Sequence, residues 1–250
     1  MNQKIFNSRK EKLDTLVEGR NGNLTIVMVH GFGTSKDENA RMFIDISKRL
    51  SAYGRIVRFD FAGYGQSEGR QEDVNLNTMA DDLKSVLDWV RKKYGGRIMI
   101  LAHSFGTLVT RYLSPDSIEK TIFTGITPPD VKAHMESTMK RIQSRVGGSL
   151  SENGVSIYPR KDGEVQKIGS SHWKILREVD PLRLAKILAQ KTDLIIIKPM
   201  QDEIVGGEAT TEQYKTISGI RFIELDGDHN FTSQRDRRGL LNTLERLIAG

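Results

Sequence analysis

The sequence contains no cysteine. This absence excludes a disulfide framework, a thiolate zinc site, an iron–sulfur cluster and a cysteine nucleophile. Long hydrophobic runs are also missing, since none approaches the ~20 residues that a membrane-spanning helix requires. The opening segment, residues 1–10, is polar and lacks the apolar centre of a signal peptide. We therefore expect a soluble cytoplasmic protein that makes no contact with a membrane.

Histidine is scarce as well, with five in 250 residues. No two of them have the H-x-x-x-H spacing of a metal-binding helix, so we expect no metal site. The glycine-rich segment 63–67 (GYGQS) lacks the G-x-x-x-x-G-K-[ST] pattern of a phosphate-binding loop, and a turn is the better interpretation. We accordingly expect no cofactor.

Positive charge exceeds negative charge only mildly, with 38 Lys and Arg against 32 Asp and Glu and a net charge of +6. The densest basic cluster consists of Arg235, Arg237 and Arg238, and Asp236 interrupts it. No basic stripe or aromatic platform accompanies the charge, so it is more typical of a soluble surface than of nucleic-acid binding. We expect no nucleic-acid partner, and strong salt-dependent retention on DNA would contradict that expectation.

Short apolar runs typical of strands alternate along the chain with longer amphipathic stretches typical of helices. The predicted strands are 13–18, 24–30, 56–61, 97–102, 118–126, 193–198 and 221–225, and the predicted helices are 42–53, 76–94, 105–113 and 230–249. This alternation predicts an α/β fold with a mainly parallel sheet flanked by helices. The length suits one large core, either as a monomer or as a homodimer.

Residues 127–179 interrupt this rhythm. The segment opens on Pro128-Pro129 and contains two alternating runs, 155–161 and 164–168, around Asp162-Gly163, which is typical of a hairpin turn. The β-α series resumes at Asp180-Pro181, where Asp can cap a helix and Pro can occupy its first turn. We expect a core made of residues 1–126 and 180–250, with 127–179 as a cap inserted above the sheet.

The strongest functional signal is Ala102-His103-Ser104-Phe105-Gly106, between a predicted strand and a predicted helix. It matches the G-x-S-x-G nucleophile elbow, with Ala in place of the first Gly. The sharp turn brings the residues two before and two after the serine close together, so both must be small. The turn would raise the Ser104 hydroxyl above the sheet and aim a helix N-terminus at the reaction centre. Ser104 is therefore the predicted nucleophile.

A second glycine-rich turn, residues 30–33 (HGFG), follows the strand 24–30. Acyl transfer develops an oxyanion, which backbone N–H groups aimed at it in advance can stabilise. The expected donors are the residue after the nucleophile, Phe105, and Phe32 in this turn. Taken alone, however, residues 30–33 would be an ordinary Gly-rich turn.

Asp202 and His229 each follow a later predicted strand. A serine hydroxyl needs a base, and the base needs a carboxylate that fixes its tautomer. Open α/β sheets place their sites just beyond the carboxyl ends of their strands. We therefore predict His229 as the base and Asp202 as the acid, with Glu203 as its competitor. The acidic neighbours of His229 in sequence are interpreted as solvated loop charges.

Together these segments resemble the α/β-hydrolase superfamily. The resemblance rests on residues 30–33 (HGFG), 59–69 (FDFAGYGQSEG), 102–106 (AHSFG), 200–205 (MQDEIV) and 227–231 (GDHNF). Within the superfamily the chain looks most like small bacterial carboxylesterases related to the cinnamoyl and feruloyl esterases and to the serine aminopeptidase-like hydrolases. The resemblance implies hydrolysis of small-molecule esters through an acyl-serine intermediate. It departs from those relatives at Ala102.

The cap is the candidate for substrate choice, and Tyr158, His172 and Trp173 are its candidate substrate-binding residues. Aromatic side chains equally often hold such a segment onto the body of a protein, and the sequence leaves both readings open. Other reactions on the same triad also stay open, namely amide or peptide cleavage, thioester hydrolysis, carbon–carbon bond hydrolysis and acyl transfer. A further alternative is a ligand-binding protein of this fold with little or no turnover.

Overall fold

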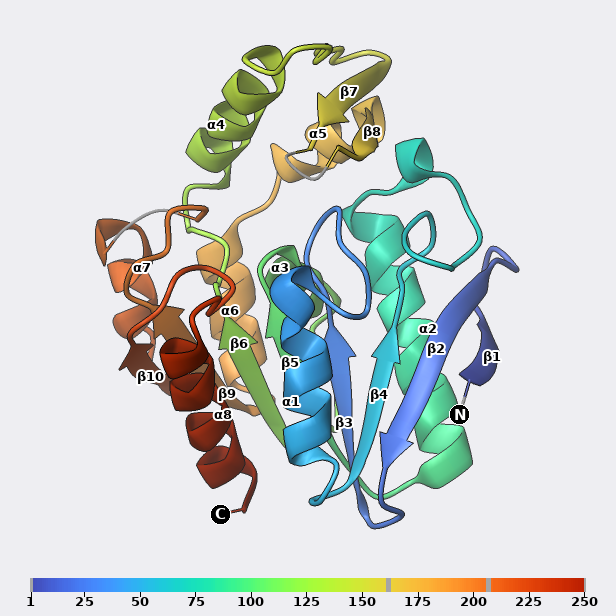
Figure 1. Ribbon diagram of the computed structural model, residues 1–250, viewed down its shortest axis with the longest axis vertical. Helices are drawn as coiled ribbons and strands as arrows, with labels where there is room; N and C mark the ends of the chain where they lie inside the picture. Colours follow the sequence, from blue (N-terminus) through green and yellow to red (C-terminus); the bar gives the residue numbers. More distant parts are fainter. Residues whose placement is uncertain (1, 161–162, 206–207, 250) are drawn as a thin grey trace.

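The computed structural model describes residues 2–160, 163–205 and 208–249. Figure 1 shows a central twisted sheet covered by helices on both faces, with a smaller group of elements above one edge. The strands are β1 (Asn2–Phe6), β2 (Lys12–Gly19), β3 (Leu24–Val29), β4 (Arg55–Phe59), β5 (Arg97–His103), β6 (Lys120–Thr124), β7 (Val155–Pro159), β8 (Val165–Gly169), β9 (Asp193–Pro199) and β10 (Ile220–Leu225). The helices are α1 (Met42–Leu50), α2 (Leu76–Tyr94), α3 (Phe105–Leu113), α4 (Val131–Gln143), α5 (Ser170–Leu176), α6 (Pro181–Ala189), α7 (Glu208–Lys215) and α8 (Gln234–Ala249), with short 3-10 turns η1 (Asn39–Arg41) and η2 (Gln71–Asp73).

The large sheet has eight strands in the order β1-β2-β4-β3-β5-β6-β9-β10. Strands β1 and β2 are paired antiparallel, as are β2 and β4, and all other neighbours in this sheet are parallel. The predicted α/β fold with a mainly parallel sheet is therefore confirmed. The inner parallel strands β3, β5 and β9 are almost continuously buried, because helices cover both of their faces, whereas the edge strand β10 is partly exposed.

Two hydrophobic layers follow from the alternation of side chains along the strands. In β3, Ile26 and Met28 pack with residues of α1 and α8, whereas Val27 and Val29 pack with residues of α2 and α3. Helices α1 and α8 thus cover one face of the sheet, and α2, α3 and α6 cover the other (Figure 1). The carboxyl ends of the parallel strands meet at the edge below the cap.

Two helix boundaries agree with the sequence prediction residue for residue, namely those of α2 and α3. Helix α8 begins four residues later than predicted. The Asp228 carboxylate accepts the N–H groups of Asn230 (3.1 Å) and Thr232 (2.9 Å), and this local turn delays the helix. Strand β1 and helices α4, α5 and α7 were not assigned from the sequence.

The segment 127–179, which we expected to form a cap and call the cap below, carries α4, the hairpin β7–β8 and α5 above the sheet edge (Figure 1). The hairpin turn was predicted at Asp162-Gly163; Asp162 lies outside the described residues, and Gly163 has a φ of +89°. The cap contributes to the main core, since Ile142, Ile168 and Trp173 are buried in the same cluster as residues of α2 and α3.

Buried Arg111, on α3, touches both ends of the cap. Its guanidinium donates to the Thr127 hydroxyl, where the chain enters the cap, and to the Pro181 carbonyl (3.2 Å), just after it leaves. A third bond reaches the Tyr214 hydroxyl (2.5 Å). One buried side chain therefore bonds the chain both where it enters the cap and just after it leaves the cap. Asp180 caps α6 as predicted, accepting the Arg183 N–H at 3.0 Å.

No helix among the described residues is both long enough and apolar enough to cross a membrane. Within the same residues, no three side chains of His, Asp or Glu gather as they would around a metal ion.

Candidate active site

Ser104 lies at the junction of β5 and α3 in a conformation that L-residues rarely adopt. Its φ is +52° and its ψ is −126°. The turn is held by the Ser104 N–H, which donates to the Thr124 carbonyl (3.0 Å), and by Thr107, whose N–H and hydroxyl donate to the Ser104 carbonyl (3.0 and 2.6 Å). Backbone strain of this kind persists only where surrounding bonds enforce it. The sharp turn expected from the elbow pattern is therefore present, with Ser104 in a strained conformation.

The elbow leaves no room for a side chain at its second glycine. A Cβ atom on Gly106 would lie 2.5 Å from the Val29 carbonyl oxygen and 2.6 Å from that of His30. Ala102, in place of the first glycine, is fully buried. Its single methyl group belongs to the core cluster that also contains Val29 and Phe123, so the departure from the glycine pattern leaves the turn intact.

Asp202 and His229 meet, although 27 residues separate them. The His229 Nδ1 and the Asp202 Oδ2 lie 2.7 Å apart, and both side chains are buried. The other carboxylate oxygen accepts the N–H groups of Ile204 (2.9 Å) and Val205 (3.1 Å). Burial alone would raise the pKa of Asp202, but the hydrogen bond from His229 and these N–H groups outweigh it and lower the pKa. Asp202 is thus held as a carboxylate.

The competing carboxylates lie elsewhere. Glu203 is exposed, Asp226 pairs with Arg235 (3.2 Å), and Asp228 binds backbone N–H groups of its own loop. Among the described residues, none of these three carboxylates is hydrogen-bonded to the His229 ring. The geometry therefore favours Asp202 over Glu203 as the partner of His229.

The loops that carry Asp202 and His229 are joined to each other. The Gln201 N–H donates to the Gly227 carbonyl (2.9 Å), and the Gly227 N–H donates to the Gln201 side-chain oxygen (2.5 Å). Arg237 is buried, and its guanidinium donates to the carbonyls of Phe231 (3.0 Å) and Asn230 (2.9 Å) beside His229. Part of the basic cluster seen in the sequence is therefore structural.

His229 lies beside the elbow. Its ring centroid is 4.6 Å from that of His103, the residue before Ser104, and both rings approach the Cα of Gly125 so closely that no side chain would fit there. Among the described residues, no hydrogen bond joins Ser104 to His229. Catalytic hydrogen bonds are often long without substrate and tighten only when it binds. Burial lowers the pKa of His103 to about 4, so this second imidazole is neutral at pH 7.

His30 fixes the orientation of the neighbouring peptide. Its Nε2 accepts the Phe61 N–H (3.0 Å), so Nε2 carries no proton and Nδ1 does. The Nδ1–H therefore donates to the Gly31 carbonyl (2.8 Å). In a trans peptide the C=O and the next N–H point in opposite directions, so this bond turns the Phe32 N–H the other way. Burial lowers the pKa of His30, which preserves this neutral tautomer.

Glu38 holds the preceding peptide, because its carboxylate accepts the Gly31 N–H. Glu38 is buried and has a φ of +57°, and Ala40 and Arg41 close behind it also have positive φ. Both a Glu38 oxygen and the Ser104 Oγ lie within 3.5 Å of the point that a Cβ on Gly31 would occupy. A strained loop thus brings a carboxylate behind the turn 30–33.

Phe32 and Phe105, the predicted oxyanion donors, are neighbours. Their rings are 5.4 Å apart in an edge-on arrangement. In the described part of the chain, neither backbone N–H donates a hydrogen bond to another protein group. Two free N–H groups beside a strained serine are what an oxyanion hole requires.

The three aromatic candidates of the cap lie in different places. The His172 ring stacks on Phe32 (4.4 Å) and Phe105 (5.5 Å), and burial lowers its pKa to about 3. Trp173 is buried in the core, and its Nε1 donates to the Ser156 hydroxyl (3.3 Å). Tyr158 is half-buried and packs against the same core. Only His172 touches the oxyanion donors.

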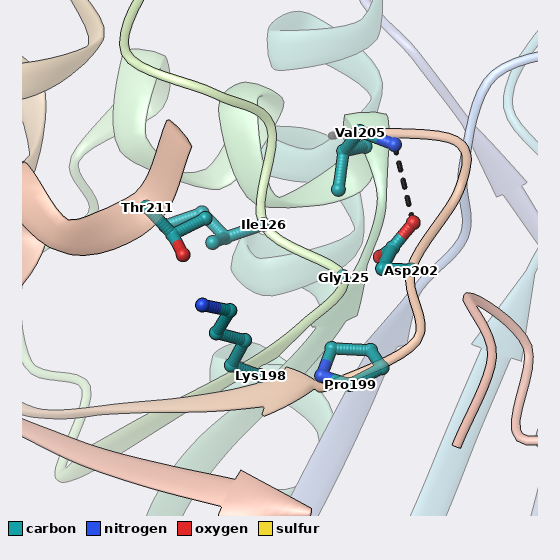
Figure 2. A pocket seen from close by; sticks show the side chains of 7 residues that line it. All are labelled: Gly125, Ile126, Lys198, Pro199, Asp202, Val205 and Thr211. Atoms are coloured by element: carbon teal, nitrogen blue, oxygen red, sulfur yellow. Dashed lines mark hydrogen bonds between the residues drawn. The ribbon is translucent and has the colours of Figure 1, made fainter. Parts of the chain in front are cut away.

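A small cavity of about 10 Å³ lies beside Asp202. Figure 2 shows its lining, in which the Lys198 amine and the Thr211 hydroxyl face each other and the Val205 N–H donates to Asp202. Its lining residues are Gly125, Ile126, Lys198, Pro199, Asp202, Val205 and Thr211. Neither Ser104 nor His229 lines it, and its volume suits about one water molecule rather than a substrate.

Several side chains around the site were not found from the sequence. Glu38, Tyr64 and Gln166 contact the turn 30–33, and His134 on α4 interacts electrostatically with His229. Their local patterns resemble any polar loop, strand or helix. Tertiary contacts between segments far apart in the sequence place these side chains at the site, so no local sequence pattern could have indicated them.

The chain belongs to the α/β-hydrolase fold family, whose model matches residues 25–152. Among curated proteins it is similar to the uncharacterized protein R595 of Acanthamoeba polyphaga mimivirus, with 26% identity over 87% of this chain and 71% of that protein. Among solved structures it is similar to the esterase Pf2001 of Pyrococcus furiosus (TM-score 0.75, 16% identity, covering 100% of this chain and 89% of that one). It is also similar to Est1E of Butyrivibrio proteoclasticus with ferulic acid bound (TM-score 0.76, 18% identity, 99% and 100%). At 16% and 18% identity, these structural likenesses show that the chain has the fold to which the family model assigns it.

Proposed function

We propose that this protein is a serine esterase that hydrolyses carboxylic esters through an acyl-serine intermediate. Ser104 is the nucleophile, His229 the base and Asp202 the acid, while the N–H groups of Phe32 and Phe105 receive the oxyanion. The observation that carries the proposal is the buried 2.7 Å contact between His229 and Asp202 beside the strained Ser104.

The steps follow from the hydrogen bonds of the site. Because His229 Nδ1–H donates to the Asp202 carboxylate, its Nε2 is left as the proton acceptor. Nε2 takes the Ser104 proton as the Oγ attacks the ester carbonyl carbon. The tetrahedral oxyanion collapses, the bond to the alcohol oxygen breaks, and the alcohol leaves with the proton from His229. Water then attacks the acyl-serine by the same base, which releases the acid and restores Ser104.

The substrate class is proposed from the surroundings of Ser104. Phe32, Phe105 and His172 bring three rings together at the oxyanion donors. Flat apolar walls of this kind suit a planar acyl group, and one structural neighbour, Est1E, has ferulic acid bound. We therefore include aromatic esters such as methyl ferulate beside short aliphatic esters as substrates to test.

The decisive experiment compares wild type with Ser104→Ala. We expect the wild type to hydrolyse p-nitrophenyl acetate or butyrate and to be labelled by a fluorophosphonate, and Ser104→Ala to lose both, with turnover reduced by about 10³-fold or more. Wild-type turnover in Ser104→Ala would contradict the mechanism. A panel of esters, thioesters and aminoacyl amides distinguishes an esterase from other hydrolases that use the same triad.

A further inference from the structure

We propose that Gln166, on cap strand β8, is a positioning residue that aims the oxyanion donor of Phe32 through the hydroxyl of Tyr64. This inference rests on the proposed esterase function. The cap would then be part of the catalytic scaffold as well as a cover over the substrate.

Gln166 is buried although it is polar and belongs to the cap hairpin. Its Oε1 accepts from Arg160 Nη1 (3.2 Å), and its Nε2 donates to the Tyr64 hydroxyl (3.2 Å). A guanidinium only donates, so the atom that faces Arg160 must be the amide oxygen. The amide nitrogen is thereby directed at Tyr64, and the orientation of the amide follows from its two partners.

Tyr64 transmits this contact to the turn 30–33. Burial raises its pKa, while the hydrogen bonds from Gln166 and from the Gly33 backbone N–H act in the opposite direction. Together with the edge-on contact between the Tyr64 and Phe32 rings (5.9 Å), this interaction places the Tyr64 oxygen beside the Gly33 N–H. That N–H belongs to the peptide on the carboxyl side of Phe32, and His30 holds the peptide on the amino side. Both peptide planes that flank the Phe32 donor are thus fixed by side chains.

Gly33 leaves space for this arrangement. Its φ is +71°, which favours glycine. A Cβ atom there would overlap with the Gln166 side-chain oxygen and would lie 2.8 Å from Arg160 Nη1. The cap hairpin is therefore seated directly on the backbone of the turn. The Phe32 ring is also contacted from the body and from the cap, since its centroid lies 5.9 Å from that of Tyr64 and 4.4 Å from that of the cap residue His172.

An interaction that only aims an oxyanion donor acts on the transition state and leaves ground-state binding unchanged. We expect Gln166→Met and Tyr64→Phe each to lower kcat about tenfold, with KM within about twofold of wild type. Removing an oxyanion donor outright typically costs about 10²–10³-fold, and a donor that is only misdirected should cost less. Because Gln166 acts through the Tyr64 hydroxyl, the double variant should be no slower than Tyr64→Phe alone.

The experiment measures kcat and KM for p-nitrophenyl butyrate, and affinity for a trifluoromethyl ketone whose serine adduct carries an oxyanion. Affinity for the ketone should fall by the same factor as kcat, a change that looser packing of the cap would not produce. Lys167→Ala is the matched control, since this neighbouring side chain on β8 is exposed. If Gln166→Met melts below the assay temperature, Gln166→Asn, which withdraws the amide by one methylene, should show the same loss.

A rise in KM with unchanged kcat would overturn the inference, and so would factors for Gln166→Met and Tyr64→Phe that multiply in the double variant. An active wild type with an unaffected Gln166→Met variant would remove this inference and leave the esterase proposal standing. A wild type without turnover and without fluorophosphonate labelling would remove both.

Discussion

Single residues in this site act mostly by fixing one orientation of a neighbour. His30 shows how, because one N–H from Phe61 selects its tautomer and the other ring nitrogen then orients a peptide. Asp202 does the same for His229, with two backbone N–H groups holding the carboxylate in place. In the proposed mechanism, the proton positions of the site are therefore set by these hydrogen bonds before any substrate binds.

The Asp202→Asn variant tests this at one atom. An amide keeps the shape but can present its N–H to His229, which favours the wrong tautomer, so we expect kcat to fall by about 10⁴-fold with KM little changed. Steady-state hydrolysis of p-nitrophenyl butyrate measures it. Glu203→Gln is the control, because Glu203 is exposed and should leave kcat unchanged. Equal losses in both variants would refute the assignment of the acid.

The residues of the proposed triad can be picked out from the sequence, whereas the side chains that support them cannot. Ser104 and Asp202 follow the buried strands β5 and β9, and His229 follows the partly exposed edge strand β10, each inside a recognisable local pattern. Tyr64 was interpreted only as part of a turn, and Gln166 carried no signal because its partner is 102 positions away. Contacts of that kind depend on how the cap is seated, which no local spacing encodes.

At the scale of elements, the best predicted helices carry their own boundary signals. Helix α2 begins at a capping box made by Asn75 and Thr78 and ends at Gly95, and its apolar positions repeat with helical spacing. Helix α7 and strand β1 are short and carry no comparable pattern. The cap was predicted in part, since the sequence indicated its hairpin and did not indicate its helices α4 and α5.

The cap is also held to the rest of the molecule through the main core, in which Trp173 is fully buried. We expect Trp173→Ala to lower the free energy of unfolding by about 3–5 kcal/mol, because it empties a fully buried site and removes the donor to Ser156. Urea unfolding followed by circular dichroism measures the loss. Val146→Ala is the control within the cap, since Val146 is 99% exposed and should change stability by less than about 0.5 kcal/mol. A loss below about 1 kcal/mol for Trp173→Ala would show that the cap is loosely attached.

For the whole molecule, buried histidines set the response to acid. Burial lowers the pKa of His103 to about 4 and that of His172 to about 3, from an ordinary 6.5. Below pH 6.5 the unfolded chain takes up these protons and the folded chain does not, so stability falls as the pH drops towards 4. Asp82 opposes this trend, because burial raises its pKa to about 6 and the folded state takes up that proton first. The histidines outnumber it, and the net effect is destabilisation in acid.

We therefore expect the free energy of unfolding to fall steadily from pH 6.5 to pH 4, by up to about 1.4 kcal/mol per pH unit for each net proton, and the urea midpoint to fall with it. His172→Phe keeps a ring against Phe32 and removes one titrating group, so its profile should be shallower by about one proton. Urea titrations at four or five pH values measure both profiles. A flat or rising wild-type midpoint on acidification would contradict the sign.

Arg111 gives the molecule one further property. Because a single guanidinium reaches Thr127 and Pro181, the points where the polypeptide departs from the hydrolase body and rejoins it are next-door neighbours in space. A segment whose two ends are adjacent can be lengthened, shortened or replaced without moving those ends, so the strands beneath it keep their register. Arg111 therefore marks the position at which related chains could carry insertions of different length and sequence on the same sheet.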